Sequence, residues 1–305
     1  MPALFVHQLL AESILKRLPS ALQARVKQCE EAYFLGAQGG DPFYLYAVVD
    51  GGLKRNIGVL MHKNNVYGQF LAWAKTVQET DNPMAFSFAL GYITHYAVDT
   101  TFHPYVCYRA DRAKENKEGR KRDNQHFRIE SDIDCLFVER HLGTTVNRYR
   151  YPNPRKGICG KELSDAFQRV AAEAWGIKTE RKPLMRAVNW FLRLQTFLQD
   201  RYFWRRKWVS GLETIFHLRR TPSCMIRRKH PDRTLENATH SEWYYPEMPT
   251  EKRTDDVWML AEKAIDRAVE LIGMFDRAVK NGDVLDREAF GLQFVSGILE
   301  KNAEK

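Results

Sequence analysis

Five side chains that could bind a metal ion lie within the 36 residues from His95 to Glu130 of this 305-residue chain. His95, Asp99 and His103 follow one another in steps of four residues, and His126 and Glu130 repeat that step. Because side chains four residues apart lie on one face of an α-helix, each step places two potential ligands about one turn apart. Nitrogen and oxygen ligands without cysteine favour zinc or a similar borderline ion.

Helical geometry divides these ligands between two ions. Each step of four residues drifts about 40° around a helix, so His95 and His103 diverge by about 80° and lie about 12 Å apart along the axis. One ion cannot easily bind both side chains. We therefore expect Asp99 to lie in the middle, near a first ion, and His103 to join His126 and Glu130 at a second.

Three further candidates precede this segment. Asp41 lies in the glycine-rich turn 36–43, His62 lies in an irregular stretch at about 47–64, and His7 lies on an amphipathic first helix. In a glycine-rich stretch the backbone can bring a ligand close to an ion. The candidate metal ligands thus number eight: His7, Asp41, His62, His95, Asp99, His103, His126 and Glu130.

Helical periodicity dominates the elements that must position these residues, and no convincing alternating strand pattern is present. We expect an all-α fold, a multi-helix bundle around a metal cleft, in a single domain over 1–305. Ligand-bearing helices would fill 1–145, and C-terminal helices would fill 146–305 with a long proline-containing connection at about 218–249. The first predicted helix ends at Pro19. The others span about 20–35, 65–80, 83–103, 127–142, 161–175, 182–207, 250–281 and 287–301.

Two boundaries bear directly on the site. Pro104 disfavours continuation of the helix that carries His95, so the helix is expected to run only to His103. Residues 109–125 are almost wholly polar and charged, which predicts an exposed loop between two ligand-bearing helices.

Composition indicates a globular protein with ample material for a core. Hydrophobic residues make up 44% and charged residues 28%, and no stretch approaches the length of a membrane span. The N-terminus lacks a basic start and a continuous apolar segment, so no export signal is visible. Five widely spaced cysteines form no C-x-x-C pair, which fits a reducing compartment. We therefore expect a cytoplasmic protein.

The net charge of +9 is concentrated in residues 201–230, where nine Lys and Arg residues accompany one acid, Glu213, for a net charge of +8. Such a patch suits anionic lipid headgroups or nucleic acid. A solvated helix face explains it equally well. The segment Tyr202–Trp208 mixes aromatic and basic side chains, so a membrane surface, stacked bases or a buried aromatic face would each account for it.

The motifs carry a family resemblance. Gly36-Ala-Gln-Gly-Gly-Asp41-Pro-Phe43, His62, Gly91-Tyr-Ile-Thr-His95-Tyr-Ala-Val-Asp99-Thr-Thr-Phe-His103-Pro104-Tyr105 and His126-x3-Glu130 resemble the zinc-dependent phospholipase C family. That family shares an all-α fold with the S1/P1 nucleases. The resemblance covers roughly 1–145, and the C-terminal half matches only loosely, through Asn237-x2-His240-x2-Trp243-x2-Pro246.

The resemblance implies two to three zinc ions. The first would be held by His62, His95 and Asp99 with Asp41 close by, and the second by His103, His126 and Glu130. A third would take His7, the other oxygen of Asp99 and the N-terminal amine and carbonyl. Excision of Met1 would expose the Pro2 amine for this role. The four-residue step from Asp99 to His103 is shorter than the six of the secreted enzymes.

By the same resemblance, the chain is expected to be a metal-dependent phosphodiester hydrolase of phospholipase C type. A metal-activated water would attack phosphorus, and Asp41 would be the catalytic residue that orients or deprotonates that water. The aromatic residues Phe43, Tyr44 and Tyr46 could line a headgroup pocket or belong to the core.

Two alternatives remain open at this point. One is a single-strand nuclease on the same fold, although Glu130 favours the phospholipase because the nucleases usually have Asp there. The other is a non-catalytic binding protein that keeps its metals for stability. The expected partners are a phosphodiester, with a phospholipid headgroup as one candidate, and a peripheral membrane or nucleic acid at 201–230, with no transmembrane segment.

Overall fold

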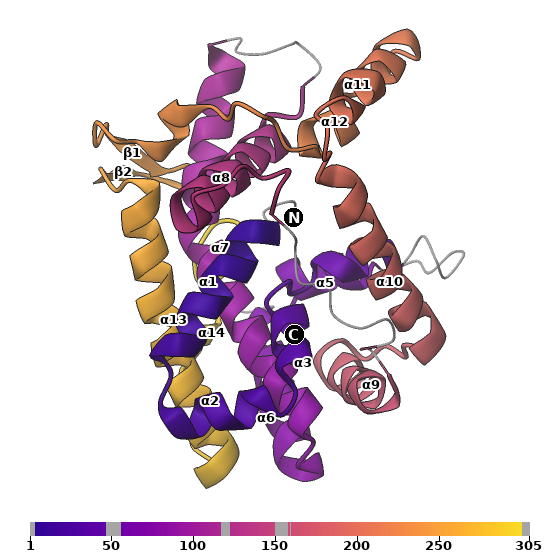
Figure 1. Ribbon diagram of the computed structural model, residues 1–305. Helices are drawn as coiled ribbons and strands as arrows, with labels where there is room; N and C mark the ends of the chain where they lie inside the picture. The colour runs from indigo at the N-terminus through magenta and orange to yellow at the C-terminus, as the bar shows by residue number, and fades with distance from the viewer. Residues whose placement is uncertain (1–3, 47–55, 117–122, 150–157, 159, 301–305) are drawn as a thin grey trace. The chain divides into compact units, whose positions relative to one another are not determined.

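The computed structural model describes residues 4–46, 56–116, 123–149, 158 and 160–300. Helices make up most of this part of the chain, so the all-α prediction is confirmed (Figure 1). The chain divides into two compact units. The first contains residues 1–9, 101–152 and 193–262, and the second contains residues 10–100, 153–192 and 263–305. The expected single domain over 1–305 stays a prediction.

The first unit holds the start of α1 (Leu4–Arg17), the end of α7 (Pro83–Glu115), α8 (Gln125–Leu142) and the end of α10 (Arg181–Leu198). Its remaining elements are α11 (Arg205–Ile215), α12 (Pro222–Met225), η2 (Arg233–Glu236), β1 (Trp243–Tyr245) and β2 (Met248–Arg253). The two strands form an antiparallel hairpin in which Trp243 pairs with Arg253 and Tyr245 with Met248. This hairpin was not predicted from the sequence.

The second unit holds the larger share of the helices. It contains most of α1 and α13 (Val257–Asn281) and the first parts of α7 and α10. The other elements are α2 (Ser20–Lys27), α3 (Glu30–Gly36), η1 (Asp41–Leu45), α5 (Ile57–Lys63), α6 (Val66–Thr80), α9 (Lys161–Trp175) and α14 (Arg287–Phe290). Among the described residues, no helix is long and apolar enough to cross a membrane.

Glycines bring α3 and α7 into close contact in the second unit. A Cβ on Gly36 would lie 2.2 Å from the carbonyl oxygen of Phe88, and one on Gly91 would lie 2.0 Å from that of Tyr33. Such distances are too short for any side chain, so both positions require glycine as the helices now pack. The turn that carries Asp41 leaves the end of α3, and His95 lies one turn after Gly91 on α7. The close approach therefore brings two candidate ligands together.

Several predicted boundaries were wrong. The helix expected to stop at His103 continues through Pro104 to Glu115, so part of the expected 109–125 loop is helical, whereas 117–122 lie outside the described residues. An internal proline destabilises a helix by about 3 kcal/mol. Tyr105, Val106 and Ala110 beyond it are buried. Burial of a large apolar side chain stabilises by about 1.5–3 kcal/mol. Burial of these side chains therefore offsets the free-energy cost of the proline.

The other differences are splits and shortenings of predicted helices. The helix at 20–35 is two helices, α2 and α3, and the helix at 182–207 is α10 followed by α11. His62 lies on α5 rather than in irregular chain, and residues 47–55 of that stretch lie outside the described residues. The helix expected at 250–281 begins only at Val257, and the one at 287–301 ends at Phe290.

Candidate metal centres

The first group of candidate ligands lies in the second unit and combines η1, α5 and α7. One ligand atom from each of Asp41, His62 and His95 lies within 4.8 Å of the others. The Nε2 atom of His62 is 3.4 Å from Asp41 Oδ1, 3.3 Å from His95 Nε2 and 3.8 Å from Asp99 Oδ2. His95 Nε2 is 3.3 Å from the same Asp99 oxygen. All four side chains are buried. We call Asp41, His62, His95 and Asp99 the first cluster.

The tautomer of His62 is fixed by its backbone neighbour. Its Nδ1 lies 2.7 Å from the carbonyl oxygen of Gly58, which can only accept a hydrogen bond, so Nδ1 donates. In the neutral ring Nε2 then carries a lone pair, and this lone pair faces the oxygens of Asp41 and Asp99. A histidine whose second nitrogen donates to a carbonyl is the usual arrangement in metal sites. The first cluster therefore fits a cation such as zinc.

Short contacts hold α5 and η1 in place around the first cluster. Asn56 caps α5 by accepting from the Val59 amide at 3.3 Å, and its side-chain amide donates to the Tyr44 carbonyl at 2.9 Å. A Cβ on Gly58 would lie 2.5 Å from the Tyr44 nitrogen, so only glycine allows this approach. His62 is one turn beyond Gly58, and its position follows from these contacts.

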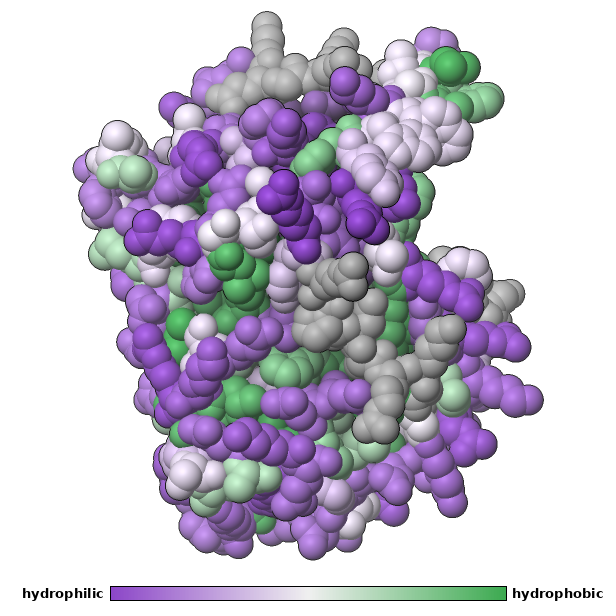
Figure 2. Space-filling model, viewed as in Figure 1, coloured by the Kyte–Doolittle hydropathy of each residue, from purple (hydrophilic) through white to green (hydrophobic). Residues whose placement is uncertain are grey.

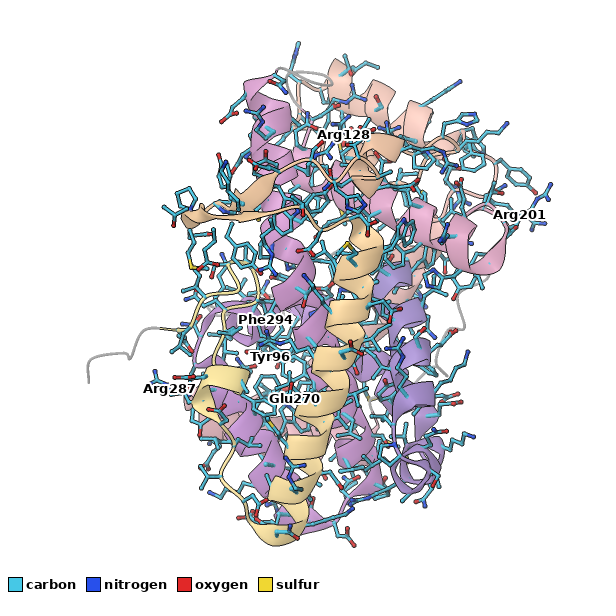
Figure 3. The ribbon with its side chains drawn as sticks, turned by 90° about the vertical axis from the view of Figure 1, so that its left-hand side faces the viewer. Tyr96, Arg128, Arg201, Glu270, Arg287 and Phe294 are labelled. Carbon is cyan, nitrogen blue, oxygen red and sulfur yellow. The ribbon has the colours of Figure 1, made fainter. Side chains whose placement is uncertain are left out.

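Aromatic side chains surround the two histidines of the first cluster. Phe294 follows α14 and packs against these rings (Figure 3). Its ring centroid lies 5.1 Å from that of His62, 5.7 Å from that of His95 and 5.1 Å from that of Tyr96. The Tyr92 hydroxyl donates to the Gln69 side chain at 2.6 Å, and burial raises the pKa of Tyr92. This apolar wall excludes water from one side of the cluster. No motif or spacing in the sequence points to Phe294, which is about 200 residues away from its neighbours along the chain.

The aromatic residues beside Asp41 belong mainly to the core. Phe43 is buried against Phe167 at 4.6 Å between centroids, and the Tyr46 hydroxyl accepts from the Glu180 amide at 3.1 Å. Tyr44 is only partly buried and lies 5.2 Å from the His62 ring. Of the three, Tyr44 alone has an exposed part beside the candidate ligands.

The second group of candidate ligands lies in the first unit, on α7 and α8. His103 Nε2 is 3.2 Å and His126 Nε2 is 3.1 Å from the same oxygen of Glu130. The two imidazole rings stack, with centroids 5.5 Å apart and planes 15° from parallel. All three ligand atoms lie within 4.8 Å of one another. We call His103, His126 and Glu130 the second cluster.

The metal-free second cluster holds a proton. Burial lowers the pKa of His126, but the Glu130 carboxylate and a hydrogen bond with Cys107 outweigh it and raise that pKa to about 9. A cation at this place would replace the proton as the partner of Glu130. Two imidazoles and one carboxylate form a ligand set that zinc accepts while keeping a position open.

An acidic residue that the sequence analysis missed holds the start of α1. Asp134 Oδ1 accepts from the amides of Phe5 and Val6 at 3.0 Å each, and Oδ2 pairs with Arg227 at 2.7 Å. Asp134 and Arg227 are fully buried, so loss of either partner would cost about 3–5 kcal/mol. Asp134 extends the His126-x3-Glu130 step by four more residues, and that continued spacing was a signal that could have found it.

His7 is buried on α1 and belongs to the first unit, as do the contacts of Phe5 and Val6 that hold this helix. Asp99, its expected partner, belongs to the second unit. The N-terminal amine lies outside the described residues. The third zinc site therefore stays a prediction, and so does zinc ligation by the two clusters.

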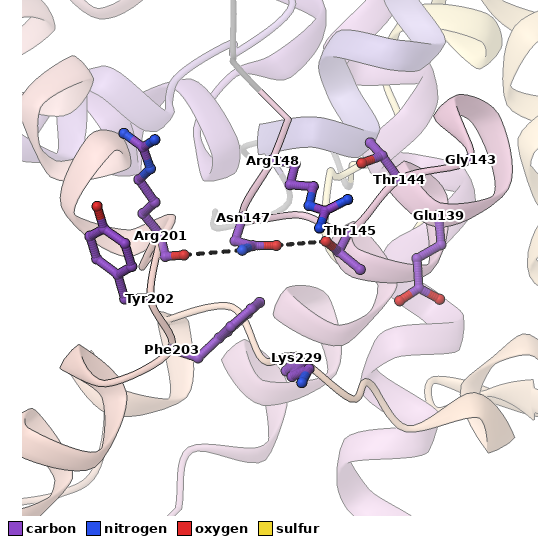
Figure 4. Close-up of a pocket in the computed structure, with 10 residues that line it drawn as sticks. All are labelled: Glu139, Gly143, Thr144, Thr145, Asn147, Arg148, Arg201, Tyr202, Phe203 and Lys229. Atoms are coloured by element: carbon purple, nitrogen blue, oxygen red, sulfur yellow. Dashed lines mark hydrogen bonds between the residues drawn. The ribbon is translucent and has the colours of Figure 1, made fainter.

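The first unit also contains a pocket of about 680 Å³ that none of the eight candidate ligands lines. Its walls come from the end of α8 and the chain after it, from residues before α11 and from Lys229 (Figure 4). Three of the lining side chains are cationic: Arg148, Arg201 and Lys229. Glu139, the acid in the wall, pairs with Arg233 at 2.6 Å, so the pocket is positively charged.

Comparison with known proteins gives one positive finding. A family model described as zinc-dependent phospholipase C matches residues 6–177, more than half of the 305-residue chain. All eight candidate ligands lie within the matched range. No curated protein and no solved structure matches the chain.

Proposed function

Because this chain belongs to the zinc-dependent phospholipase C family, we propose that it hydrolyses the phosphodiester of a phospholipid on the glycerol side of phosphorus. Water adds its oxygen to phosphorus, the bond from phosphorus to the glycerol oxygen breaks, and that oxygen takes up a proton. The products are diacylglycerol and a phosphorylated headgroup. Bound zinc would supply Lewis-acid polarisation and a water of lowered pKa.

The observation that carries the proposal is the convergence of potential ligand atoms around His62 Nε2. Because Gly58 fixes the donor at Nδ1, Nε2 points its lone pair at two carboxylates and at His95. Carboxylate oxygens and imidazole nitrogens that meet in a buried place form a ligand set that can bind one cation. Ligand groups of this kind are what the family's zinc dependence requires.

Each residue of the first cluster would have a separate task. His62 and His95 would hold zinc, and Asp99 would divide its two oxygens between this ion and a neighbouring one. Asp41, at the start of η1, would orient the attacking water and accept its proton, because its Oδ1 lies 3.4 Å from His62 Nε2. His103, His126 and Glu130 would hold a further ion, and His7 would take part in a third.

The test combines metal content with activity. Purified full-length protein is loaded with zinc, and release of phosphocholine from phosphatidylcholine is measured alongside zinc by elemental analysis. We expect two to three zinc ions per chain and hydrolysis in the wild type, and His62→Ala should lose hydrolysis and the zinc of the first cluster. His141→Ala is the matched control, because His141 bonds only the Phe137 carbonyl and lies outside both clusters.

The other readings are outcomes of the same experiment. Cleavage of single-stranded DNA without phosphatidylcholine hydrolysis would support the nuclease. Zinc binding with neither activity would support a non-catalytic protein. Absence of bound zinc from the wild-type protein would refute the proposed function.

A further inference from the structure

Large apolar side chains are exposed on α11 and the residues around it. Of the 17 exposed large hydrophobic residues in the described part of the chain, seven lie between Tyr202 and Leu218. Figure 2 shows pale and green side chains gathered at the upper right, over α11. Concentrated exposure of this kind marks an interaction site, whereas single exposed apolar residues are ordinary.

Four of the seven form one stripe at helical spacing. Trp204 precedes α11, and Trp208, Leu212 and Ile215 follow at steps of four, four and three residues. Trp208 is 57% exposed and Ile215 is 69% exposed. At 100° per residue these side chains fall within about 80° of one another, so they cover one face of the helix. We call Trp204, Trp208, Leu212 and Ile215 the apolar stripe.

The opposite face of α11 is polar and buried, which is the reverse of an ordinary surface helix. Glu213 accepts from the Ser223 amide at 3.1 Å, and Arg206 donates to the Ser223 carbonyl at 3.1 Å. Ser210 bonds Arg220. The Arg206 amide also donates to Asp200 at 3.0 Å. These contacts fix the rotation of α11 about its axis, so the apolar stripe faces outward as a consequence of specific bonds.

Cations border the apolar stripe on both sides. Lys207 and Arg205 lie next to it on the helical wheel, and Arg205 also donates to the Phe197 carbonyl at 3.1 Å. Arg201 and Tyr202, just before α11, line the cationic pocket described above. Basic side chains of α11 and of the residues just before it therefore accompany the apolar stripe.

We propose that α11 is an interfacial membrane anchor that lies in the plane of an anionic phospholipid surface, with the apolar stripe among the upper acyl chains. Tryptophan with Lys and Arg is the composition of such helices. Eleven residues span about 16 Å, too short to cross a bilayer. A second copy of the chain is a less suitable partner for the apolar stripe, because lysine is depleted in protein–protein interfaces. The choice of a lipid surface rests on the proposed function.

The test measures binding to vesicles rather than turnover. Every full-length protein carries Asp41→Asn, so that vesicles are not consumed, and is sedimented with phosphatidylcholine vesicles containing phosphatidylglycerol. We expect the reference protein to bind, and Trp208→Glu and Ile215→Glu each to weaken binding about tenfold or more. Trp190→Glu is the matched control, because Trp190 is 53% exposed but lies on α10. It should bind like the reference.

The outcomes separate the two proposals. Circular dichroism should be unchanged in all variants, since the replaced side chains are exposed. Equal binding by Trp208→Glu, Ile215→Glu and the reference, or no binding by the reference, overturns the anchor whether or not the protein hydrolyses lipid. A dimer that Ile215→Glu dissociates, with no vesicle binding, also overturns it and assigns the stripe to a second copy. Vesicle binding by the reference, together with no hydrolysis by zinc-loaded wild-type protein, refutes the proposed function alone.

Discussion

One hydrogen bond determines what His62 can do. Because the Gly58 carbonyl takes the Nδ1 proton, Nε2 is presented as a ligand before any ion arrives. In the first cluster, a backbone carbonyl thus orients His62 as a potential metal ligand. The second cluster is prepared differently, since its ligands share a proton that a metal must displace. Zinc binding at the second cluster should therefore release a proton.

Replacement of Asp41 separates a catalytic from a structural role. Asp41→Asn keeps the shape of the side chain but removes its ability to accept a proton, so we expect turnover to fall about 10²–10⁴-fold. Zinc content should stay close to that of the wild type, because His62, His95 and Asp99 remain. Elemental analysis and phosphocholine release measured on the same sample test this. Parallel loss of zinc and turnover would instead make Asp41 only a ligand.

Zinc binding at the second cluster should depend on pH. With its pKa raised to about 9, His126 is protonated at neutral pH in the metal-free protein, and zinc needs the neutral ring. Affinity should therefore rise about tenfold per pH unit up to about pH 9 and then level off. In the metal-free protein, the same shift contributes stability that is fully present below about pH 6.5 and is lost as pH rises through 9.

Competition titration with a zinc chelator measures this dependence in a His95→Ala background, which removes one ligand of the first cluster. His126→Gln is the control and should bind zinc weakly with a flat profile. An affinity in the reference that does not change between pH 6 and 8 would contradict the raised pKa.

At the scale of elements, glycine contacts bring the ligands together. Gly39 has a φ of +56°, and a Cβ there would lie 2.0 Å from Cδ2 and 2.4 Å from Nε2 of His95. A Cβ on Gly40 would lie 2.7 Å from the His62 ring. The turn between α3 and η1 thus passes close to both imidazoles at its two glycines.

Gly39→Ala should displace the His95 ring and release zinc from the first cluster. The variant also carries left-handed strain of about 1–2 kcal/mol. Gly143→Ala is the matched control, because Gly143 has a φ of +59° and nothing within 4 Å of its Cβ position, so it experiences the strain alone. Elemental analysis should show zinc loss in Gly39→Ala only. Equal zinc content in both variants would mean that the His95 ring can move aside without losing its ion.

Elements whose pattern is local were predictable, and those that depend on distant contacts were not. The four-residue steps at His95 and His126 follow from helical geometry, and helices carry both as expected. The passage of α7 through Pro104 depends on burial of the residues beyond it, which a local rule does not include. Phe294 reaches the first cluster from the far end of the chain, so no spacing could reveal it. Asp134 had a signal in its spacing that was overlooked.

At the scale of the whole molecule, zinc should contribute to stability as well as to chemistry. If zinc is present at about a thousand times its dissociation constant, it stabilises the folded state by about 4 kcal/mol per site. Removal by a chelator should then lower Tm by roughly 10 °C. Differential scanning calorimetry with and without chelator measures the shift, and restored zinc should reverse it. An unchanged Tm would mean that the clusters bind no zinc in the folded protein.

The family assignment covers residues 6–177 and rests on the part of the chain that holds both clusters. A cytoplasmic location and a single domain over 1–305 stay predictions. The C-terminal half was the least predictable part, because the basic segment 201–230 allowed a solvated face, a nucleic-acid surface and a membrane surface. The proposal of a membrane surface rests on the rotation of α11, which depends on the bond between Glu213 and the Ser223 amide, and a charge count does not reveal such a bond.

The outward stripe of α11 has a kinetic consequence for an enzyme whose substrate forms the surface it binds. An anchored molecule would remain on one vesicle between turnovers and exhaust the outer leaflet before moving to another. With more vesicles than protein molecules, hydrolysis should therefore stop at a plateau set by the fraction of vesicles that received an enzyme. Trp208→Glu should replace this processive course with a slow, steady one in which every vesicle is eventually visited.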